Sequence, residues 1–390
     1  MVKTNISQFS KCANCGACVN ACPANAIWVD REEMYYTPRV DDTKCVQCGK
    51  CVSVCPVNTP TKTQNLIGAY YGYADDSAIL AGSSSGGMVH VLAQKILDEG
   101  GVVFGAAYSE DSHSVVFRST DEVSLRALQK SKYVESNVGD SFHRVKEELE
   151  KGRSVLFCGT PCQSFGLKRY LGKEYEKLLV CDFSCGGLPS HQMYHEYLCN
   201  LEERFSAQVS LVDFRPKNFG WKSHSIYVRF ENGREYTRLA PLDPYYKGFL
   251  NSLSKRDYCY RCDFADNHAA DIILADFWLY KKLSDMDNQD RGISLVLTNT
   301  EKGERVVREM APGLVMQTLP LEKGSYNIKS GHMSQDKIER HMRFVKAVQA
   351  DGFVHAINRE IPFSLRRTWK QLLKQLIRKG KYEGSKETRS

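Results

Sequence analysis

The segments that decide the fold are Cys12-Ala-Asn-Cys15-Gly-Ala-Cys18-Val-Asn-Ala-Cys22-Pro23 and Cys45-Val-Gln-Cys48-Gly-Lys-Cys51-Val-Ser-Val-Cys55-Pro56. Both have the spacing C-x2-C-x2-C-x3-C-P, and the second repeats the first 33 residues later. They contain eight of the 15 cysteines of the 390-residue chain. The opening residues show no apolar stretch of the secretory-signal kind, so we expect a reducing compartment. There, clustered cysteines indicate metal or redox chemistry rather than disulfide bonds.

The repeated spacing is typical of bacterial ferredoxins that hold two 4Fe-4S clusters. In that pattern three close cysteines bind one cluster, and the fourth, which precedes a proline, binds the other. Zinc sites are the alternative for thiolate ligands, but zinc needs only two C-x2-C pairs and would not explain the remaining cysteines. The predicted ligand sets are Cys12, Cys15, Cys18 and Cys55 for one cluster, and Cys45, Cys48, Cys51 and Cys22 for the second.

Length and charge limit the other function classes. At roughly 100–200 residues per domain, the length predicts two or three domains. The net charge of +7 is concentrated in residues 366–390, which hold nine Lys/Arg and two Glu. The rest of the chain has 44 basic and 44 acidic residues, so we expect no nucleic-acid partner. No stretch approaches the ~20 apolar residues of a membrane span.

Beyond a polar linker at 60–66, the pattern changes to strands alternating with helices. Helical spacing is seen at 88–99 and 141–151, and short apolar runs at 102–108, 154–159 and 177–183 indicate buried strands. Such runs separated by helices predict a largely parallel sheet. Two alternating strands joined through Asn232-Gly233 predict a hairpin.

The later cysteines suggest a third four-thiolate site. VLFCGTPC and LLVCDFSC each place one cysteine inside an apolar run and another in the loop beyond it, where ligands bind in parallel sheets. A C-x2-C pair follows in a turn-like segment. The candidate ligands are Cys162, Cys185, Cys259 and Cys262. For Cys158 and Cys181 we favour a role as small buried apolar side chains, and we expect Cys199 to be structural.

An ordered set of motifs resembles the coenzyme F-420 hydrogenase/dehydrogenase beta-subunit family. The motifs are SSSGG at 83–87, SKY at 131–133, GTPCQ at 159–163, Asp182 with SCGGLPS at 184–190, GWK at 220–222, CYRC at 259–262 and ADFW at 275–278. The likeness covers roughly residues 66–320 in order. Within the family, the chain is most similar to members with an attached two-cluster ferredoxin from bacterial polysaccharide-biosynthesis gene clusters.

The resemblance implies bound FAD, a 4Fe-4S cluster beside it and two-electron exchange with a small organic substrate. A Ser/Gly-rich turn that opens a helix suits a diphosphate, because its amides are unobstructed. The residues implied in cofactor binding are Ser84, Ser85, Gly86, Gly87, Ser131, Lys132, Tyr133, Gly159, Thr160 and Pro161. Asp276, Phe277 and Trp278 resemble the family's strand-end motif near the cluster.

The chain departs from the family at one position. Cys185-Gly186-Gly187 stands where the family frequently has Cys-His-Gly, so this chain lacks that histidine and any proton-donor role it would have. His191 and His224 are candidate substitutes, although each is more simply interpreted as a packing or surface histidine. The sequence therefore assigns no catalytic residue.

The C-terminal segment has the pattern of a basic amphipathic helix. Its apolar residues recur at helical spacing between Leu365 and Ile377, and basic residues cover most of the remaining surface. Such a helix can lie on an anionic membrane, but it can also pack on the protein itself. We expect a cytoplasmic protein, with peripheral contact at the inner membrane face if this helix binds lipid.

The sequence thus predicts an α+β and α/β protein in three parts. These are a bacterial-type ferredoxin domain at 1–62, a mixed α/β FAD and iron–sulfur domain at 66–335, and a helical basic tail at 336–390. The predicted function is an iron–sulfur flavoprotein oxidoreductase that moves electrons through 4Fe-4S clusters to FAD and a small-molecule substrate. The alternative is an electron-relay subunit, linked to a ferredoxin, a deazaflavin or a redox partner protein.

We predict that the anaerobically purified protein holds about twelve iron atoms per chain, at four per 4Fe-4S cluster. The eight ferredoxin cysteines and the four later ones supply three ligand sets. Iron and acid-labile sulfide measured together test this count. About eight of each would remove the third cluster, and zinc in place of iron would contradict all three.

Overall fold

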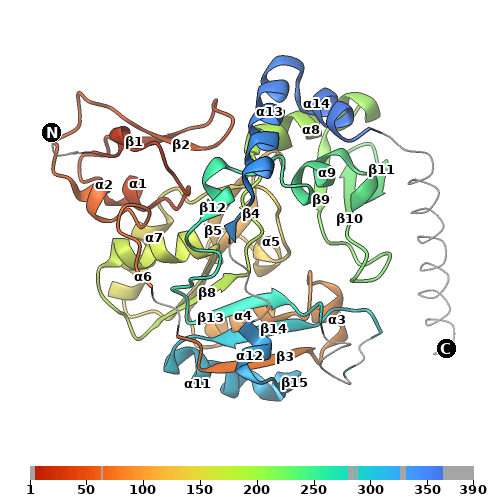
Figure 1. The fold of residues 1–390 in the computed structure, drawn as a ribbon. Helices are drawn as coiled ribbons and strands as arrows, with labels where there is room; N and C mark the ends of the chain where they lie inside the picture. The colour runs from red at the N-terminus through yellow and green to blue at the C-terminus, as the bar shows by residue number, and fades with distance from the viewer. Residues whose placement is uncertain (1–4, 63–64, 280–285, 287–288, 326–330, 363–390) are drawn as a thin grey trace.

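The computed structural model describes residues 5–62, 65–279, 286, 289–325 and 331–362 (Figure 1). Its N-terminal lobe contains short helices and one hairpin, packed around Ile6, Ile27 and Cys51. The elements are η1 (Ile6–Gln8), α1 (Ala17–Ala21), β1 (Ile27–Asp30), β2 (Thr37–Val40) and α2 (Lys50–Ser53).

The sequence repeat is also a repeat of backbone geometry. Gly16 precedes α1 and Gly49 precedes α2, with φ of +80° and +72°. Only glycine adopts this left-handed conformation without strain, which explains the glycine after the second cysteine of each run. Each short helix thereby begins at a cysteine loop and carries the third cysteine of its run.

A nine-stranded sheet forms the centre of the molecule, in the order β15-β3-β14-β13-β8-β7-β4-β5-β6. Its strands are β3 (Gly68–Ala74), β4 (Val102–Tyr108), β5 (Val115–Ser119), β6 (Ser136–Asn137), β7 (Val155–Gly159), β8 (Leu178–Phe183), β13 (Ile272–Asp276), β14 (Ser294–Thr298) and β15 (Leu314–Thr318).

The expectation of a largely parallel sheet is wrong. Four of the eight strand pairings are parallel, and the other four are antiparallel. Helices cover both faces, so the central strands are apolar throughout whatever their direction. The apolar runs identify buried strands correctly, but burial alone does not encode strand direction.

Helices pack on both faces of this sheet. One face is covered by α4 (Met88–Asp98), α5 (Leu125–Leu128) and α11 (Glu301–Met310), and the other by α6 (Ser141–Glu150) and α7 (Pro161–Leu171). Short helices α3 (Ser77–Ala81), α12 (Leu321–Ser325) and η4 (Ala311–Gly313) flank the β3 end. The predicted helices at 88–99 and 141–151 are therefore confirmed.

A second layer surrounds a three-stranded sheet of order β11-β10-β9. Its hairpin turns at Asn232-Gly233, as predicted. The elements are α8 (His191–Phe205), β9 (Val209–Asp213), β10 (Ser225–Phe230), β11 (Glu235–Leu239), η2 (Ala240–Leu242), α9 (Pro244–Leu250), α13 (Gln335–Asp351) and α14 (Phe353–Glu360). Between the layers lie η3 (Asp257–Tyr260) and the small pair β12 (Arg261–Cys262) and β16 (Gly331–His332).

The helical character expected after residue 335 is confirmed for α13 and α14. The basic amphipathic segment at 365–377 lies outside the described residues. Within the described part of the chain, no helix is both long and apolar enough to cross a membrane.

Candidate redox centres and their basic neighbour

The eight N-terminal thiols form two groups, as the spacing predicts. Burial raises the pKa of Cys18 well above its ordinary value, and the neighbouring thiols of Cys15, Cys12 and Cys55 raise it further. The other group lines a small hollow in the N-terminal lobe. Its thiols are Cys22, Cys45, Cys48 and Cys51. We call these the first and second thiol groups.

Polar N–H groups point at these thiols. The backbone amide of Asn14 lies 3.3 Å from the Cys12 sulfur, and that of Ala26 lies 3.2 Å from the Cys22 sulfur. N–H groups directed at sulfur stabilise thiolate charge, and they are one of the means by which proteins tune iron–sulfur centres. Both groups therefore fit a metal cluster better than protonated thiols.

Four later cysteines form a third set, which we call the inner thiol group: Cys162, Cys185, Cys259 and Cys262. Burial raises the pKa of Cys259 to about 12, and the neighbouring thiols of Cys185 and Cys262 contribute to this rise. The amides of Gly187 and Leu188 each donate to a sulfur of the group at 3.4 Å. The pKa values of all four thiols are raised, chiefly by desolvation, so the thiols would stay protonated at neutral pH unless a metal displaced the protons.

The start of α7 places Cys162 in this group. Thr160 caps the helix in a reciprocal capping box with Gln163, and Pro161 occupies the first turn. The Thr160 hydroxyl lies 3.1 Å from the Cys162 sulfur. The residues 159–161, which the family resemblance implies in cofactor binding, thus also form the loop that positions Cys162.

Cys158 and Cys181 lie elsewhere, on the opposite face of the sheet. They are paired in register on the parallel strands β7 and β8, and they pack in the core beneath α4. Cys162 packs in the core beneath α6 and α7. The alternation of side chains along a strand therefore separates these two thiols from the inner group, and the preference for a packing role agrees with the structure.

The SSSGG and SKY motifs, about 45 residues apart in sequence, meet in the structure. The amide of Ser131 donates to the Ser84 hydroxyl at 2.8 Å. Gly86 is packed against the sheet, where a Cβ would lie 2.5 Å from the carbonyl oxygen of Gly72. A larger side chain at residue 86 would therefore disrupt the fold whether or not a ligand binds there.

Basic side chains gather beside these motifs, and we call Lys130, Lys132, Arg215 and Lys217 the basic cluster. Burial lowers the pKa of Lys132 to about 7. Burial, followed by repulsion from Arg215 and Lys130, lowers the pKa of Lys217 to about 7.

Two members of the basic cluster have carboxylate partners. Lys130 pairs with Asp213, and Arg215 pairs with Asp276. Among the described residues, the other two ammonium groups donate hydrogen bonds to backbone carbonyls: Lys132 to those of Gln129 and Lys130, and Lys217 to those of Leu80 and Ser85. Two half-buried ammonium groups without a carboxylate partner indicate a site for an anion.

The GWK and ADFW motifs complete this region. The Trp221 indole donates to Asp276 at 3.1 Å, and its ring stacks on Trp278 with centroids 4.5 Å apart. The His224 ring lies against Trp278, and burial together with Arg215 lowers the pKa of His224 to about 4. His224 therefore lies at the candidate site and is neutral at physiological pH.

Two stacked aromatic rings lie between the basic cluster and the inner thiol group. Tyr133 accepts a hydrogen bond from Arg215 and stacks on Phe249, with ring centroids 4.9 Å apart. Phe249 in turn lies beside Gly186 and beneath the ammonium group of Lys255. Gly186 follows Cys185 directly, so the two candidate sites are neighbours.

The first thiol group lies against the inner one through α7. A Cβ on Gly166 would lie 3.0 Å from the Cβ and 3.2 Å from the sulfur of Cys15. Cys15 also contributes to the raised pKa of Cys162. Glycine at residue 166 thus permits a close approach of the N-terminal lobe to the helix that carries Cys162.

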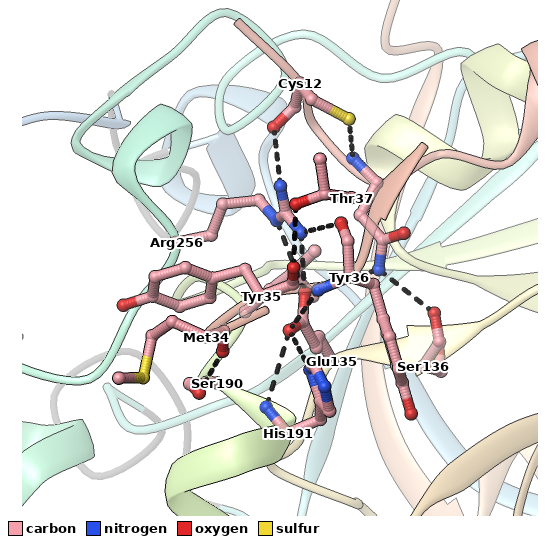
Figure 2. Close-up of polar contacts among 12 residues, drawn as sticks. Cys12, Met34, Tyr35, Tyr36, Thr37, Glu135, Ser136, Ser190, His191 and Arg256 are labelled. Carbon is pink, nitrogen blue, oxygen red and sulfur yellow. Dashed lines mark hydrogen bonds and ion pairs between the residues drawn. The ribbon is translucent and has the colours of Figure 1, made fainter. Parts of the chain in front are cut away.

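A buried carboxylate holds the N-terminal lobe to the rest of the protein (Figure 2). Glu135 is fully buried and forms ion pairs with Arg256 at 3.0 Å and with the His191 ring at 2.8 Å. It also accepts from the Tyr36 amide at 3.0 Å and from the Asn14 side chain at 3.4 Å.

Opposing effects set the charge of this carboxylate. Burial by itself raises the pKa of Glu135, but Arg256 and His191 outweigh burial, so the net pKa is lowered. Arg256 also donates to the carbonyl oxygens of Cys12 and Tyr36. We call Glu135 with these partners the Glu135 junction.

His191 is a packing histidine. Its ring stacks on Tyr36 with centroids 3.8 Å apart, and its nitrogens contact Glu135 and the Arg31 carbonyl. It joins the N-terminal lobe to α8, so the structure favours its simpler interpretation. Of the two candidate histidines, His224 is the one that lies among the GWK and ADFW motifs.

Comparisons with known proteins identify the family of the chain. Two family models for "Coenzyme F420 hydrogenase/dehydrogenase, beta subunit" match the chain, the N-terminal one at residues 69–141 and the C-terminal one at residues 152–323. Residues 11–59 match the 4Fe-4S dicluster domain, which confirms the ferredoxin prediction. These matches define an iron–sulfur redox protein of the oxidoreductase type. The chain belongs to the coenzyme F420 hydrogenase/dehydrogenase beta-subunit family and has an N-terminal 4Fe-4S dicluster domain.

A solved structure of the xenon-derivatised F420-reducing [NiFe] hydrogenase complex from Methanosarcina barkeri contains a similar chain. The two are 16% identical, and the alignment covers 75% of this chain and 94% of that chain with a TM-score of 0.45. That score is too low to establish a shared fold. No curated protein sequence matches the chain.

Sequence reasoning missed the residues that connect the sites. Glu135 and Arg256 are 121 residues apart, and no local pattern links them. Arg215 and Lys217 precede GWK by a few residues, so a search of the motif's flanks would have found them. Phe249 has no sequence signal beyond its place in an aromatic-rich helix.

We predict that Cys162→Ala loses about four iron atoms per chain, because removing one thiolate removes a ligand of a four-iron site. Cys158→Ala should keep the full iron content, since its side chain packs in a separate core. Iron, acid-labile sulfide and the melting temperature of both variants test this. Iron loss in Cys158→Ala with retention in Cys162→Ala would overturn the assignment.

We also predict that Glu135→Gln loosens the N-terminal lobe, because it leaves the buried Arg256 guanidinium without its counter-charge. Breaking a buried pair costs about 3–5 kcal/mol. Hydrogen–deuterium exchange should rise in α1 and in the β1–β2 hairpin. The control is Glu122→Gln, which removes the more exposed Glu122–Arg144 pair and should cost at most about 1 kcal/mol. Equal exchange in both variants would contradict the role of the Glu135 junction.

Proposed function

We propose that the chain is an iron–sulfur flavoprotein oxidoreductase that moves electrons through three 4Fe-4S clusters to FAD and a small organic substrate. The clusters would supply single-electron transfer, and FAD would couple single electrons to two-electron chemistry. The proposed cluster ligands are the cysteines of the first, second and inner thiol groups.

The observation that carries the proposal is the order in which these sites lie. The second thiol group includes the exposed Cys48, and the first group shares the N-terminal lobe with it. The first group lies against α7 at Gly166, and α7 begins at the inner group. Phe249 and Tyr133 then lead to the basic cluster. The candidate redox sites thus form one continuous series from the protein surface to an anion site.

The charges of the basic cluster suit the diphosphate of FAD, and the aromatic rings beside the cluster suit its isoalloxazine ring. Lys132 and Lys217 offer positive charge, and the Ser84–Gly87 turn precedes the 11-residue helix α4. Lys217 donates to the Ser85 carbonyl and holds this turn in place. The exposed ring of Trp278, stacked on the buried Trp221, provides flat apolar surface of the kind that aromatic cofactors use. Gly159, Thr160 and Pro161 would contribute through the α7 loop.

The charges around the inner thiol group favour an anionic cluster. Burial lowers the pKa of Lys255, and the thiols of Cys259 and Cys185 oppose this effect. Arg256 lies three residues before Cys259 and is also buried. Two buried cations beside four thiolates offset part of the cluster's negative charge, which favours its reduced form.

The second candidate function is an electron-relay subunit whose partner performs the chemistry. The observation in its favour is the family description itself, which names a beta subunit. Turnover of an organic substrate by the isolated protein with dithionite-reduced ferredoxin would support the enzyme. Activity only with a partner subunit would support the relay. The proposal also includes a deazaflavin as a candidate electron donor and a setting in polysaccharide biosynthesis. It further includes a cytoplasmic location with peripheral membrane contact.

FAD affinity should depend on pH through Lys132. Burial lowers the Lys132 pKa to about 7 in the protein, and a bound diphosphate would raise it. FAD binding therefore takes up a proton above pH 7, so affinity should fall as pH rises from 7 to 9, by up to about tenfold per pH unit for each proton. Lys132→Gln should bind FAD more weakly at pH 7 and should show a flatter pH dependence, measured by flavin fluorescence.

The matched control is Lys146→Gln, which removes an exposed lysine paired with Glu150 on α6. It should leave both FAD affinity and its pH dependence unchanged. An unaltered pH profile in Lys132→Gln would show that the basic cluster does not hold the cofactor. Absence of FAD from the wild-type protein, with all iron present, would favour the relay subunit.

A further inference from the structure

A group of side chains on α8 and on the neighbouring β4–β5 turn lies apart from all three thiol groups. It contains His113, His195, Cys199 and Glu202. One nitrogen from each imidazole and the Cys199 sulfur all lie within 4.8 Å of one another. From this geometry we propose that His113, His195 and Cys199 form a Zn²⁺ site, with Glu202 supporting His113 from behind.

Helical spacing explains why His195 and Cys199 lie close together. His195 and Cys199 are four residues apart on α8, so their side chains project from the same face of the helix. The Cys199 sulfur lies 3.6 Å from Nε2 of the His195 ring. Both side chains are exposed, so a metal ion can reach them from solvent.

The turn between β4 and β5 brings the third ligand. His113 lies in this turn, which is closed by the Ser109 amide donating to the Ser114 carbonyl at 2.9 Å. The buried Tyr194 hydroxyl, on α8, donates to the Ser112 carbonyl at 3.0 Å. The turn is therefore attached to the helix one residue before His113 and one residue before His195.

Glu202 fixes the tautomer that a metal ligand needs. Its carboxylate lies 2.9 Å from Nε2 of His113, which places the ring proton on that nitrogen. The lone pair of Nδ1 then accepts a hydrogen bond from Nδ1 of His195 at 2.9 Å, and a metal ion would take the place of that shared proton. Glu202 is itself held by the Val209 amide at 2.8 Å. A histidine oriented from behind by a carboxylate is the arrangement that metal sites use repeatedly.

The ligand set and the spacing suit zinc. Two imidazoles and one thiolate are ligands that Zn²⁺ prefers, and Zn–N and Zn–S bonds of about 2.0–2.1 and 2.3 Å separate tetrahedral ligand atoms by roughly 3.3–3.6 Å. The two Nδ1 atoms, now 2.9 Å apart, need to move apart by a few tenths of an ångström. The Cys199 sulfur, which lies nearest to Nε2 of His195, needs to rotate toward the Nδ1 side, and both of these side chains are exposed and free to turn. The fourth position would be taken by water. The bound ion would attach the β4–β5 turn to α8, in addition to the Tyr194 hydrogen bond.

The test uses the anaerobically purified protein with its iron intact, dialysed against buffered Zn²⁺ and analysed for zinc and iron together. We expect one zinc per wild-type chain with unchanged iron. His195→Ala and Cys199→Ser should each bind zinc at least tenfold more weakly. Glu202→Gln should weaken binding about 10- to 100-fold, as expected when the carboxylate behind a ligand is lost.

Two measurements keep the test decisive. The control His143→Ala removes an exposed histidine on α6 that pairs with Glu147, and it should bind zinc like the wild type. Zinc should raise the melting temperature of the wild type and of this control, but not of Cys199→Ser, whose exposed side chain is not needed for folding. Equal zinc in wild type and His195→Ala, no zinc in either, or zinc gained with loss of iron would each overturn the proposal.

Discussion

The carboxylate of Glu135 is the constraint on which the arrangement of the redox sites depends. Burying an ion costs several kcal/mol, and the cost is offset only when its partners are in place. Here the partners come from distant segments: Asn14 and Tyr36 from the N-terminal lobe, His191 from α8, and Arg256 from the loop before η3. The network therefore favours one placement of the lobe, in which the first thiol group lies against α7.

The same segments that make this network also carry the cysteines of the candidate redox sites. Arg256 precedes Cys259 by three residues, and it donates to the carbonyl oxygen of Cys12. One guanidinium thus contacts the loop of the first thiol group, while its own segment supplies two cysteines of the inner group. Docking of the lobe and assembly of the inner thiol group are coupled through this residue.

The sequence was most informative where chemistry is local. A C-x2-C spacing places thiols on one loop, so the first and second groups followed from counting residues. The inner group required two further arguments, the loop position of Cys162 and Cys185 and the nearby C-x2-C pair, and the structure brings these four together. Strand alternation then separates Cys158 and Cys181 from them. For the SSSGG and SKY motifs, the family resemblance implied a shared site, and the Ser84–Ser131 hydrogen bond shows that the two motifs are in contact.

The features that the sequence did not predict depend on contacts between distant segments. Buried strands are apolar whether they run parallel or antiparallel, so the sequence does not indicate the four antiparallel pairings of the central sheet. Glu135 follows SKY by only two residues, but its role depends on Arg256, 121 residues away. The attachment of the His113 turn to α8 likewise depends on Tyr194, whose hydroxyl donates to the Ser112 carbonyl, 82 residues away in the sequence.

Because Gly166 contacts Cys15, helix α7 sets the distance between the first and the inner thiol groups. Cys162 and Gly166 are four residues apart on one helix, so one rigid face carries a cysteine of the inner group and the docking point of the first group. Electron tunnelling slows steeply with distance, and the spacing within a single turn of helix is fixed for as long as Cys15 stays docked against Gly166. Internal exchange between the two groups would therefore stay constant, and only the outer surface, at the exposed Cys48, would be left to respond to whichever protein delivers or removes electrons.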